Sequence, residues 1–517
     1  MPLLANHATL SAAMNVLIQQ GNLLDFSCDL LIINLFEGLS KFRGATGAVD
    51  EALRGGLSDL LKRAGFKGKL GERLVFPTFG KLKARRVCVL GLGPRQKFSE
   101  DTVRMVGGYV IKIAREANAK RVVTILHGAG VSGLKVPVTA QALGEGLRLG
   151  AYRFHAYHGT GTRDHALKRD PQSLVIVESE VKSAQSGLER ARILSEATIL
   201  ARDLVNTPSR DMTPAHLAAV ARSLTSRGSG IRCAILDHER MSKLGLRAAL
   251  AVGEGSQHKP VGVHLVYTPP RRPKQRLAVI GKAVTFDSGG LNLKSEQGMV
   301  TMKIDMAGAA TVLGLFKALP ALNLPVEVHG IFLAVENMPS GASYRPGDVV
   351  KAMNGMTIEI LNTDAEGRVT LADALSYAKK KVKPDAIIDL ATLTGAAVVA
   401  LGEDISALMT NHRQLAAHLI KAARKSGEQI WELPLYEPYE QALKSKLADL
   451  NNTGGRDAGC IKGGLFLKRF AGATPWAHLD IAGPSYCEKE TRPDVPVGGT
   501  GVGVRTLIAY LETVSRP

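Results

Sequence analysis

The chain alternates short apolar runs, rich in strand-forming residues, with segments of helical periodicity, and this alternation constrains its fold more than any other feature. Runs typical of buried strands cover residues 30–35, 86–90, 121–126, 261–267, 276–280, 326–335 and 386–390. Helical patterns, with apolar residues at i, i+3, i+4 and i+7, occur at 312–319 and 371–378. Another helix is expected to begin after Ser99, whose hydroxyl can cap it. Alternation of this kind predicts parallel or mixed sheets flanked by helices.

A long helical pattern over about 183–205 marks the domain junction. It stops before Asn206-Thr-Pro208, because proline disfavours helix in the residue that precedes it. We therefore predict two α/β domains joined by a linking helix at 183–206. The smaller N-terminal domain, 1–182, has a mixed sheet, and the larger C-terminal domain, 207–517, has a central mixed sheet flanked by helices.

Composition and missing motifs exclude several classes of protein. Hydrophobic residues make up 45% of the chain and charged residues 22%, as in folded globular proteins. No apolar run approaches the roughly 18 residues of a membrane span, and residues 1–24 contain no Lys or Arg for a targeting peptide. We therefore expect no membrane association and a cytoplasmic location. The P-loop, HExxH and GxSxG motifs are missing.

The chain is basic, with 66 Lys and Arg against 47 Asp and Glu and a net charge of +19. Residues 51–100 alone hold 12 basic and 4 acidic side chains, including Lys81, Lys83, Arg85 and Arg86. Such a patch is compatible with nucleic-acid binding, although no nucleic-acid motif accompanies it. We favour the alternative of a solvated face on an ordinary enzyme.

Four carboxylates stand where predicted strands end or helices start: Asp287, Asp305, Asp364 and Glu366. Ligands of open α/β sheets bind at that edge. Residues i and i+2 of an extended chain share a face, so Asp364 and Glu366 are expected to point together ahead of a helix that begins near Thr370. Four clustered anions need neutralising cations, and two divalent ions supply the matching charge. Taken singly, each acid has the alternative of capping a helix or pairing with a surface Lys or Arg.

These residues lie in motifs that closely resemble the M17 family of leucyl aminopeptidases. The signature NTDAEGR stands intact at 362–368, and the segment 281–294 carries the family pattern GK-x4-DSGG followed by Lys294. Further similar segments are 206–209, 251–256, 302–308, 336–341, 392–396 and 476–483. The resemblance covers about 195–510, whereas over 1–180 it is only architectural.

The resemblance implies a catalytic C-terminal domain that removes the N-terminal residue of peptides, preferably Leu or another apolar residue. It implies two metal ions, Zn²⁺ or Mn²⁺ with Mg²⁺ and Co²⁺ as further candidates, held by Lys282, Asp287, Asp305, Asp364 and Glu366. Lys282 would bind metal as a neutral amine; its alternative is an ordinary ammonium paired with Asp287.

The remaining roles also come from the resemblance. Lys294 would stabilise the tetrahedral intermediate, and Arg368 would hold a bicarbonate ion that shuttles the proton. Met302, Thr392, Gly395 and Ala482 match positions lining the pocket for the first side chain, although plain core packing is the alternative. The family also implies a homohexamer. This sequence departs from the family in a loop where Cys460 and Lys462 are unexpected and where Gly463 and Gly464 replace alanines. We interpret His478 and Asp480 as structural.

Overall fold

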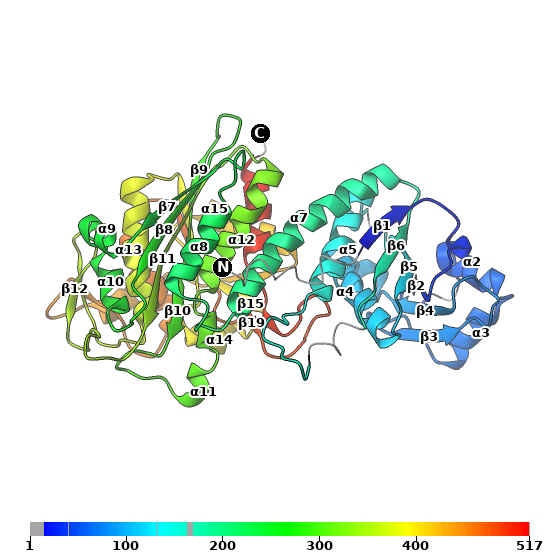
Figure 1. Cartoon of the computed structure of the whole chain (residues 1–517), viewed down its shortest axis with the longest axis horizontal. Coiled ribbons are helices and arrows are strands. Elements are labelled where there is room, and N and C mark those ends of the chain that lie inside the picture. Colours follow the sequence, from blue (N-terminus) through cyan, green and yellow to red (C-terminus); the bar gives the residue numbers. More distant parts are fainter. Residues whose placement is uncertain (1–14, 40, 132, 163–168, 516–517) are drawn as a thin grey trace. The chain divides into compact units, whose positions relative to one another are not determined.

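The computed structural model describes residues 15–39, 41–131, 133–162 and 169–515 (Figure 1). By contacts, the chain divides into two compact units. The first holds residues 1–195 and 489–496, and the second holds 196–488 and 497–517. The limits 1–182, 183–206 and 207–517 stay a prediction from the sequence. A single long helix, α7 (Val181–Asn206), contributes to both units.

The first unit is built on a six-stranded mixed sheet in the order β1-β6-β5-β2-β4-β3. Its strands are β1 (Asn15–Gln19), β2 (Leu30–Leu35), β3 (Arg73–Pro77), β4 (Arg86–Gly91), β5 (Arg121–Ile125) and β6 (Ser173–Val177). All neighbours are parallel except β3 and β4. Separate apolar clusters lie on its two faces, one including side chains of α4 and α5 and the other side chains of α2 and α3.

The helices of the first unit follow local sequence signals. They are α2 (Gly44–Ala52), α3 (Gly56–Arg63), α4 (Glu100–Glu116) and α5 (Val136–Ala151). The predicted cap is present, because the Ser99 hydroxyl accepts a hydrogen bond from the Thr102 amide. Glycines let α4 and α5 approach closely: a Cβ added at Gly146 would lie 1.9 Å from the carbonyl oxygen of Arg104.

The second unit contains a nine-stranded sheet with the main order β16-β15-β18-β14-β9-β11-β8-β7, and β10 also pairs with β11. The strands are β7 (Ile231–Leu236), β8 (Val261–Tyr267), β9 (Arg276–Gly281), β10 (Ala283–Asp287), β11 (Glu327–Asn337), β14 (Ala386–Ala391), β15 (Ile405–Thr410), β16 (Gln429–Glu432) and β18 (Trp476–Asp480). The central strands β11, β9, β14 and β18 are parallel, and antiparallel pairs lie toward both edges. The prediction of two α/β folds with mixed sheets is confirmed.

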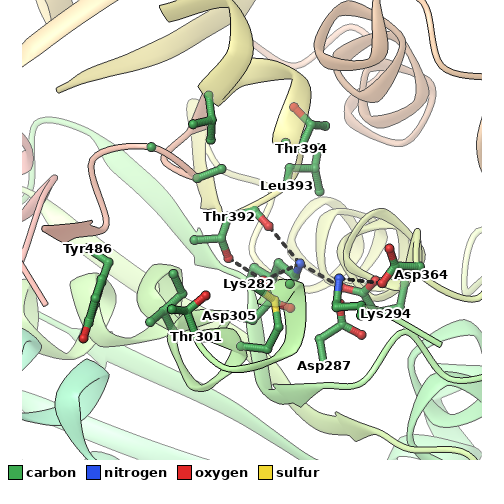
Figure 2. Close-up of a pocket in the computed structure, with 18 of the residues that line it drawn as sticks. Lys282, Asp287, Lys294, Thr301, Asp305, Asp364, Thr392, Leu393, Thr394 and Tyr486 are labelled. Carbon is green, nitrogen blue, oxygen red and sulfur yellow. Dashed lines mark hydrogen bonds and ion pairs between the residues drawn. The ribbon is translucent and has the colours of Figure 1, made fainter. Parts of the chain in front are cut away.

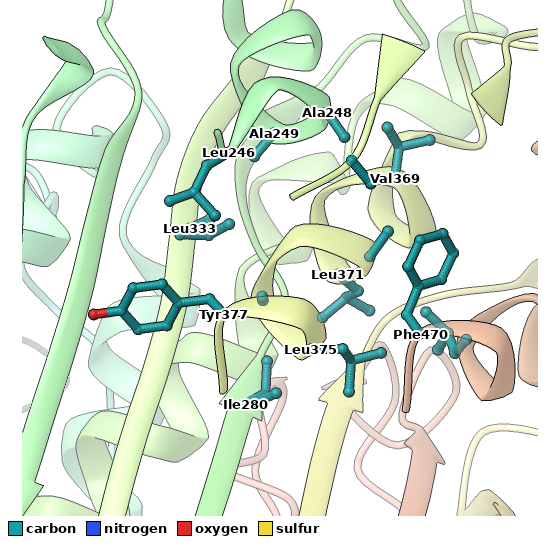
Figure 3. Close-up of a cluster of buried hydrophobic side chains, with 14 of the residues drawn as sticks. Leu246, Ala248, Ala249, Ile280, Leu333, Val369, Leu371, Leu375, Tyr377 and Phe470 are labelled. Atoms are coloured by element: carbon teal, nitrogen blue, oxygen red, sulfur yellow. The ribbon is translucent and has the colours of Figure 1, made fainter. Parts of the chain in front are cut away.

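Helices cover both faces of this sheet. The set α8 (Pro214–Ser223), α12 (Ala307–Leu322), α15 (Arg413–Ser426) and α17 (Val504–Ser515) packs on one face. On the other, α10 (Arg247–Gly253), α13 (Glu366–Lys381) and α16 (Gly459–Ala471) enclose a large apolar cluster. Figure 3 shows Leu371 and Leu375 of α13 below Ala248 and Ala249 of α10, with Phe470 of α16 to their side. This packing fixes the N-terminus of α13 at the sheet edge.

One helical stretch, residues 296–322, reaches the length and mean hydropathy of a membrane span, which the sequence analysis did not anticipate. Its most apolar window is 72% buried inside the protein. The stretch includes α12, whose residues Val312, Leu315 and Phe316 have no exposed surface. Burial of this kind is that of a core helix.

Candidate active site

A cavity of about 550 Å³ opens in the second unit and collects most of the predicted site residues (Figure 2). It is lined by the predicted metal ligands Lys282, Asp287, Asp305, Asp364 and Glu366, by Lys294, and by all four predicted pocket residues, Met302, Thr392, Gly395 and Ala482. Arg368 does not line the cavity. The lining residues come from sequence positions 282 to 488 and meet because β10, β14 and α13 end or begin at one edge of the sheet.

Lys282 lies between two carboxylates at the bottom of the cavity. Its Nζ is 2.7 Å from Oδ1 of Asp305 and 2.8 Å from Oε1 of Glu366, and it donates to the carbonyl oxygen of Thr392 at 2.9 Å. Burial lowers the pKa of this amine, but the carboxylates of Asp305, Glu366 and Asp287 outweigh burial and hold the pKa well above its usual value. The ammonium therefore pairs with Asp305 and Glu366, not with Asp287.

Lys294 joins the other two carboxylates. Its Nζ lies 2.7 Å from Oδ2 of Asp287 and 2.5 Å from Oδ1 of Asp364. Burial and the neighbouring carboxylates of Asp287 and Glu366 raise the pKa of Asp364 to about 6, although Lys294 opposes the rise. The four carboxylates and two ammonium groups thus form one cluster, in which each ammonium pairs with two carboxylates.

The turn that presents Asp364 and Glu366 corrects one expectation. Helix α13 begins at Glu366, not near Thr370, so Glu366 and Arg368 occupy its first turn and the chain here is not extended. Asp364 and Glu366 still approach each other: one oxygen from each, with one from Asp287, lie within 4.8 Å of one another. A carboxylate in the first turn is favoured by the positive end of the helix.

The cluster has features that fit divalent cations. Oδ2 of Asp305 is buried and finds no hydrogen-bond partner within the described part of the chain, and a buried carboxylate oxygen without a partner is costly. Carboxylate oxygens in this number are ligands for Mg²⁺, Mn²⁺ or Zn²⁺. The donor set of the four carboxylates therefore suits divalent metal ions.

Arg368 has features that fit an anion. Its side chain is buried, and none of the ion pairs among the described residues involves it; Nη1 donates to the carbonyl oxygen of Thr453 at 3.3 Å. Burial lowers the pKa of its guanidinium, with the carboxylates of Glu366 and Asp480 opposing the shift. A buried guanidinium without a counter-ion suits a planar oxyanion.

One positioning residue, Asn337, escaped the search for candidate ligands. Asn337 donates from Nδ2 to Oδ1 of Asp287 at 2.8 Å and to the carbonyl oxygen of Thr363 at 3.0 Å, so it links two of the acidic segments. The register of parallel strands β10 and β11 places it opposite Asp287. The sequence offered one signal for Asn337: it follows a predicted strand and lies within the segment 336–341, which resembles the M17 family.

Asp480 links two segments of the cavity wall through hydrogen bonds. Its carboxylate accepts hydrogen bonds from the amides of Leu393 and Ala482 and from the Thr394 hydroxyl. His478 pairs with Asp389 at 2.5 Å, and both side chains are fully buried. Glu403, Tyr486 and Glu488 also line the cavity, and the sequence analysis named none of them.

Comparison with known families bears on this site. The model of the cytosol aminopeptidase family's catalytic domain matches residues 199–508, and the model of its N-terminal domain matches 32–160. The chain belongs to the cytosol aminopeptidase family. It is therefore a peptidase, and the recognition made from residues 362–368 and the segments similar to them is confirmed.

Relatives within the cytosol aminopeptidase family match over nearly the whole chain. A probable cytosol aminopeptidase of Geobacter sulfurreducens is 39% identical over 513 residues, 97% of this chain and 100% of the relative. One of Thermosynechococcus vestitus is 42% identical over 494 residues, 95% of this chain and 98% of the relative. The general aminopeptidase function predicted from the sequence is thus supported for the chain.

Solved structures of similar fold agree with the family. The bottromycin maturation enzyme BotP in complex with Mn has a TM-score of 0.82 and 36% identity, covering 94% of this chain and 100% of that one. A mutant of tomato leucine aminopeptidase has a TM-score of 0.84 and 35% identity, covering 96% of each chain. The fold of both units is therefore that of a leucine aminopeptidase.

Proposed function

We propose that the cavity binds two divalent metal ions and removes the N-terminal residue from peptides, with a preference for Leu and other apolar residues. The observation that carries the proposal is the buried cluster in which Asp287, Asp305, Asp364 and Glu366 surround two lysine ammonium groups. Four acids against two lysines leave an excess of negative charge that metal cations would neutralise.

The proposed metal ligands are the four carboxylates and Lys282. When bound, divalent ions lower the pKa of water and act as Lewis acids toward a carbonyl. Lys282 would then bind as a neutral amine. Mn²⁺ and Zn²⁺ are our first choices, with Mg²⁺ and Co²⁺ as further candidates; the presence of Mn in the BotP structure supports divalent metal use.

Lys294 is the proposed electrostatic catalyst. Burial lowers the pKa of its amine, but the carboxylates of Asp287, Glu366 and Asp364 outweigh it and hold the pKa above its usual range, so the group is an ammonium at neutral pH. An ammonium at the cavity wall stabilises the negative charge that develops on the carbonyl oxygen during hydrolysis. Lys294 therefore takes the role of oxyanion stabiliser.

Arg368 is the proposed holder of bicarbonate. It lies two residues after Glu366 in the first turn of α13, and its guanidinium is buried without an ion pair among the described residues. The fork of a guanidinium grips a planar anion through two hydrogen bonds. A bicarbonate held there would take up the proton released during hydrolysis.

The substrate's first side chain is proposed to occupy the part of the cavity lined by Met302, Thr392, Gly395 and Ala482. Met302 is flexible, and Gly395 and Ala482 are small, so this wall admits branched and unbranched apolar groups. The Thr392 hydroxyl is not free for substrate, because it donates to Oδ1 of Asp305 at 2.6 Å.

The test is hydrolysis of leucine p-nitroanilide by the full chain with and without a chelator. We expect chelation to abolish leucine release and added Mn²⁺ or Zn²⁺ to restore it. The variant Glu366→Ala should stay inactive with either metal. Full activity in chelator would contradict the metal dependence, and an active Glu366→Ala would contradict the ligand assignment.

We further propose a cytoplasmic location and a homohexameric assembly, with an additional DNA-binding role as the alternative. The name of the family supports a cytoplasmic location, and the homohexamer rests on the resemblance alone. No structural observation favours DNA binding: in the basic window, Lys83 pairs with Asp25 at 3.2 Å and Arg85 with Asp29 at 3.7 Å. DNA binding would be supported by a mobility shift that persists near physiological salt and is lost when the basic side chains of residues 81–86 are neutralised.

A further inference from the structure

The cavity has a second charged region, separate in sequence from the cluster of acids and lysines. Glu403 follows helix α14 (Gly395–Leu401), and Glu488 follows strand β19 (Tyr486–Cys487); both line the cavity together with Tyr486. Both glutamates are exposed, and among the described residues neither forms an ion pair or a side-chain hydrogen bond. Their carboxylates are thus free of ion pairs within the described part of the chain.

Packing holds Glu403 against the wall proposed to contact the first side chain. A Cβ added at Gly483, next to Ala482, would lie 2.3 Å from the carbonyl oxygen of Gly402 and 3.2 Å from Cα of Glu403. The two segments therefore touch backbone to backbone. The backbone of Glu403 therefore lies beside Gly483, the residue after Ala482.

Tyr486 lies at the end of the cavity away from the lysines. In Figure 2 it stands beyond Thr301, on the side opposite to Lys294 and Asp364, and its ring is seen edge-on with a face turned toward Thr301. Burial, and then the carboxylate of Glu488, raise the pKa of Tyr486. Glu488 follows Tyr486 by two residues, and both side chains line the same cavity.

We propose that Glu403, Glu488 and Tyr486 form a subsite for a cationic first side chain, so that the enzyme also accepts peptides beginning with arginine or lysine. This inference rests on the proposed aminopeptidase function. The inner carboxylates are already paired with Lys282 and Lys294, whereas the two outer glutamates offer unpaired negative charge to the substrate. A ring face adds a favourable site for a guanidinium or ammonium.

The size of the cavity agrees with this assignment. Its volume of about 550 Å³ lies in the range of sites for drug-sized ligands, and exceeds what one leucine side chain fills. A long side chain that enters along Met302 and Ala482 has room to carry its charge to the outer end. The apolar stem would contact the same residues as leucine, and only the terminal group would meet the glutamates.

The experiment compares arginine and citrulline 7-amido-4-methylcoumarin with the Mn²⁺-loaded full chain. Citrulline has nearly the same shape as arginine without the charge, so the ratio of the two kcat/KM values isolates recognition of charge. We expect arginine to exceed citrulline by about tenfold in the wild type. Each of Glu403→Gln and Glu488→Gln should lower the ratio about threefold, as for exposed ion pairs, and the double variant should bring it near one.

The matched control is Glu296→Gln, because Glu296 is an exposed acid of the neighbouring helix α11 (Glu296–Met299) that does not line the cavity. It should keep the wild-type ratio. Leucine hydrolysis with a ratio near one in the wild type, or a ratio that the double variant leaves unchanged, overturns the inference and leaves the proposed function standing. Failure of the wild type to hydrolyse the leucine substrate overturns both.

Discussion

The Nζ atom of Lys282 lies 2.7 Å from Oδ1 of Asp305, and both side chains are almost completely buried. Glu366 completes the group on the other side of the amine. In the apoprotein, Lys282 is thus the counter-charge that these two buried acids share.

We predict that Lys282→Met lowers the free energy of unfolding of the chelated protein by about 3–5 kcal/mol, because it leaves two buried carboxylates without their cation. Urea denaturation in chelator measures the loss. The control Lys243→Met removes a surface pair with Glu239, whose side chains are 73% and 76% exposed, and should cost under about 1 kcal/mol. Equal losses for the two variants would contradict the role of Lys282.

Asp389 is predicted to anchor the strands behind the site. It accepts hydrogen bonds from Nε1 of Trp476 and from Nδ1 of His478, both at 2.5 Å, in a fully buried group. Burial lowers the pKa of His478, but Asp389 outweighs it, so the pKa is raised and the imidazolium is favoured. Asp389→Asn should cost about 3 kcal/mol in urea denaturation.

Asp404→Asn is the control for that variant, because Asp404 is exposed and has no hydrogen-bond or ion-pair partner among the described residues. It should stay within about 0.5 kcal/mol of the wild type. An Asp389→Asn variant as stable as Asp404→Asn would show that the buried group contributes nothing.

His127 makes the first unit sensitive to acid. The Thr124 hydroxyl donates to the carbonyl oxygen of Ile32, so it accepts from Nε2 of His127 at 2.7 Å and leaves Nδ1 to accept from the amide of Asn34 at 2.9 Å. Complete burial lowers the pKa of His127 to about 3, below the 6.5 of the unfolded chain. The unfolded state therefore binds a proton in this range and the folded state does not.

The contribution of His127 to the free energy of unfolding is thus fully present above about pH 6.5 and decreases as the pH falls toward 3. Between pH 7 and pH 5 the loss is about 2 kcal/mol, at 1.4 kcal/mol for each pH unit below 6.5. Hydrogen exchange of the amides of β2 and β5 at the two pH values locates the effect. His127→Asn should flatten this dependence, whereas substitution of the exposed His238 should not.

Two glycines of helices are predicted to respond to alanine in opposite ways. At Gly463 of α16 an added Cβ would lie 3.1 Å from Cδ2 of Leu393, the end of a flexible side chain. Gly463→Ala should therefore stabilise the protein by up to about 1 kcal/mol through helix propensity. At Gly146 the Cβ would meet the backbone of Arg104 at 1.9 Å, so Gly146→Ala should destabilise by more than about 2 kcal/mol. Thermal denaturation of both variants decides the signs.

Local patterns were enough to predict seven of the strands and the long helix at the domain junction. The run 261–267 is β8 in full, and Ser99 caps α4 as expected, because apolar periodicity and a capping hydroxyl act within a few residues. The start of α13 was not predictable in this way. Oδ1 of Asn452 accepts from the amides of Leu361 and Asn362, and its Nδ2 donates to the carbonyl oxygen of Asn362. A residue 90 positions away thus shapes the turn before the helix.

The candidate site, too, was predictable only in part from local sequence. Strand ends and acid counts indicated which carboxylates would meet, but not which lysine pairs with which acid. Lys282 and Asp287 belong to neighbouring positions in sequence, yet Lys282 turns toward Glu366, while Lys294 reaches Asp287. That choice depends on the path of the loop between β10 and α11, which no periodicity describes.

The most direct test of the two-metal account is the number of ions bound to each chain. A chelator first removes metal from the protein, which is then loaded with Mn²⁺ and freed of excess ions. Inductively coupled plasma mass spectrometry measures the Mn²⁺ content per chain. We predict two ions in the wild type and at most one in Asp364→Asn. A wild-type chain that holds fewer than one ion at saturating Mn²⁺, or an Asp364→Asn chain that retains two, would contradict the account.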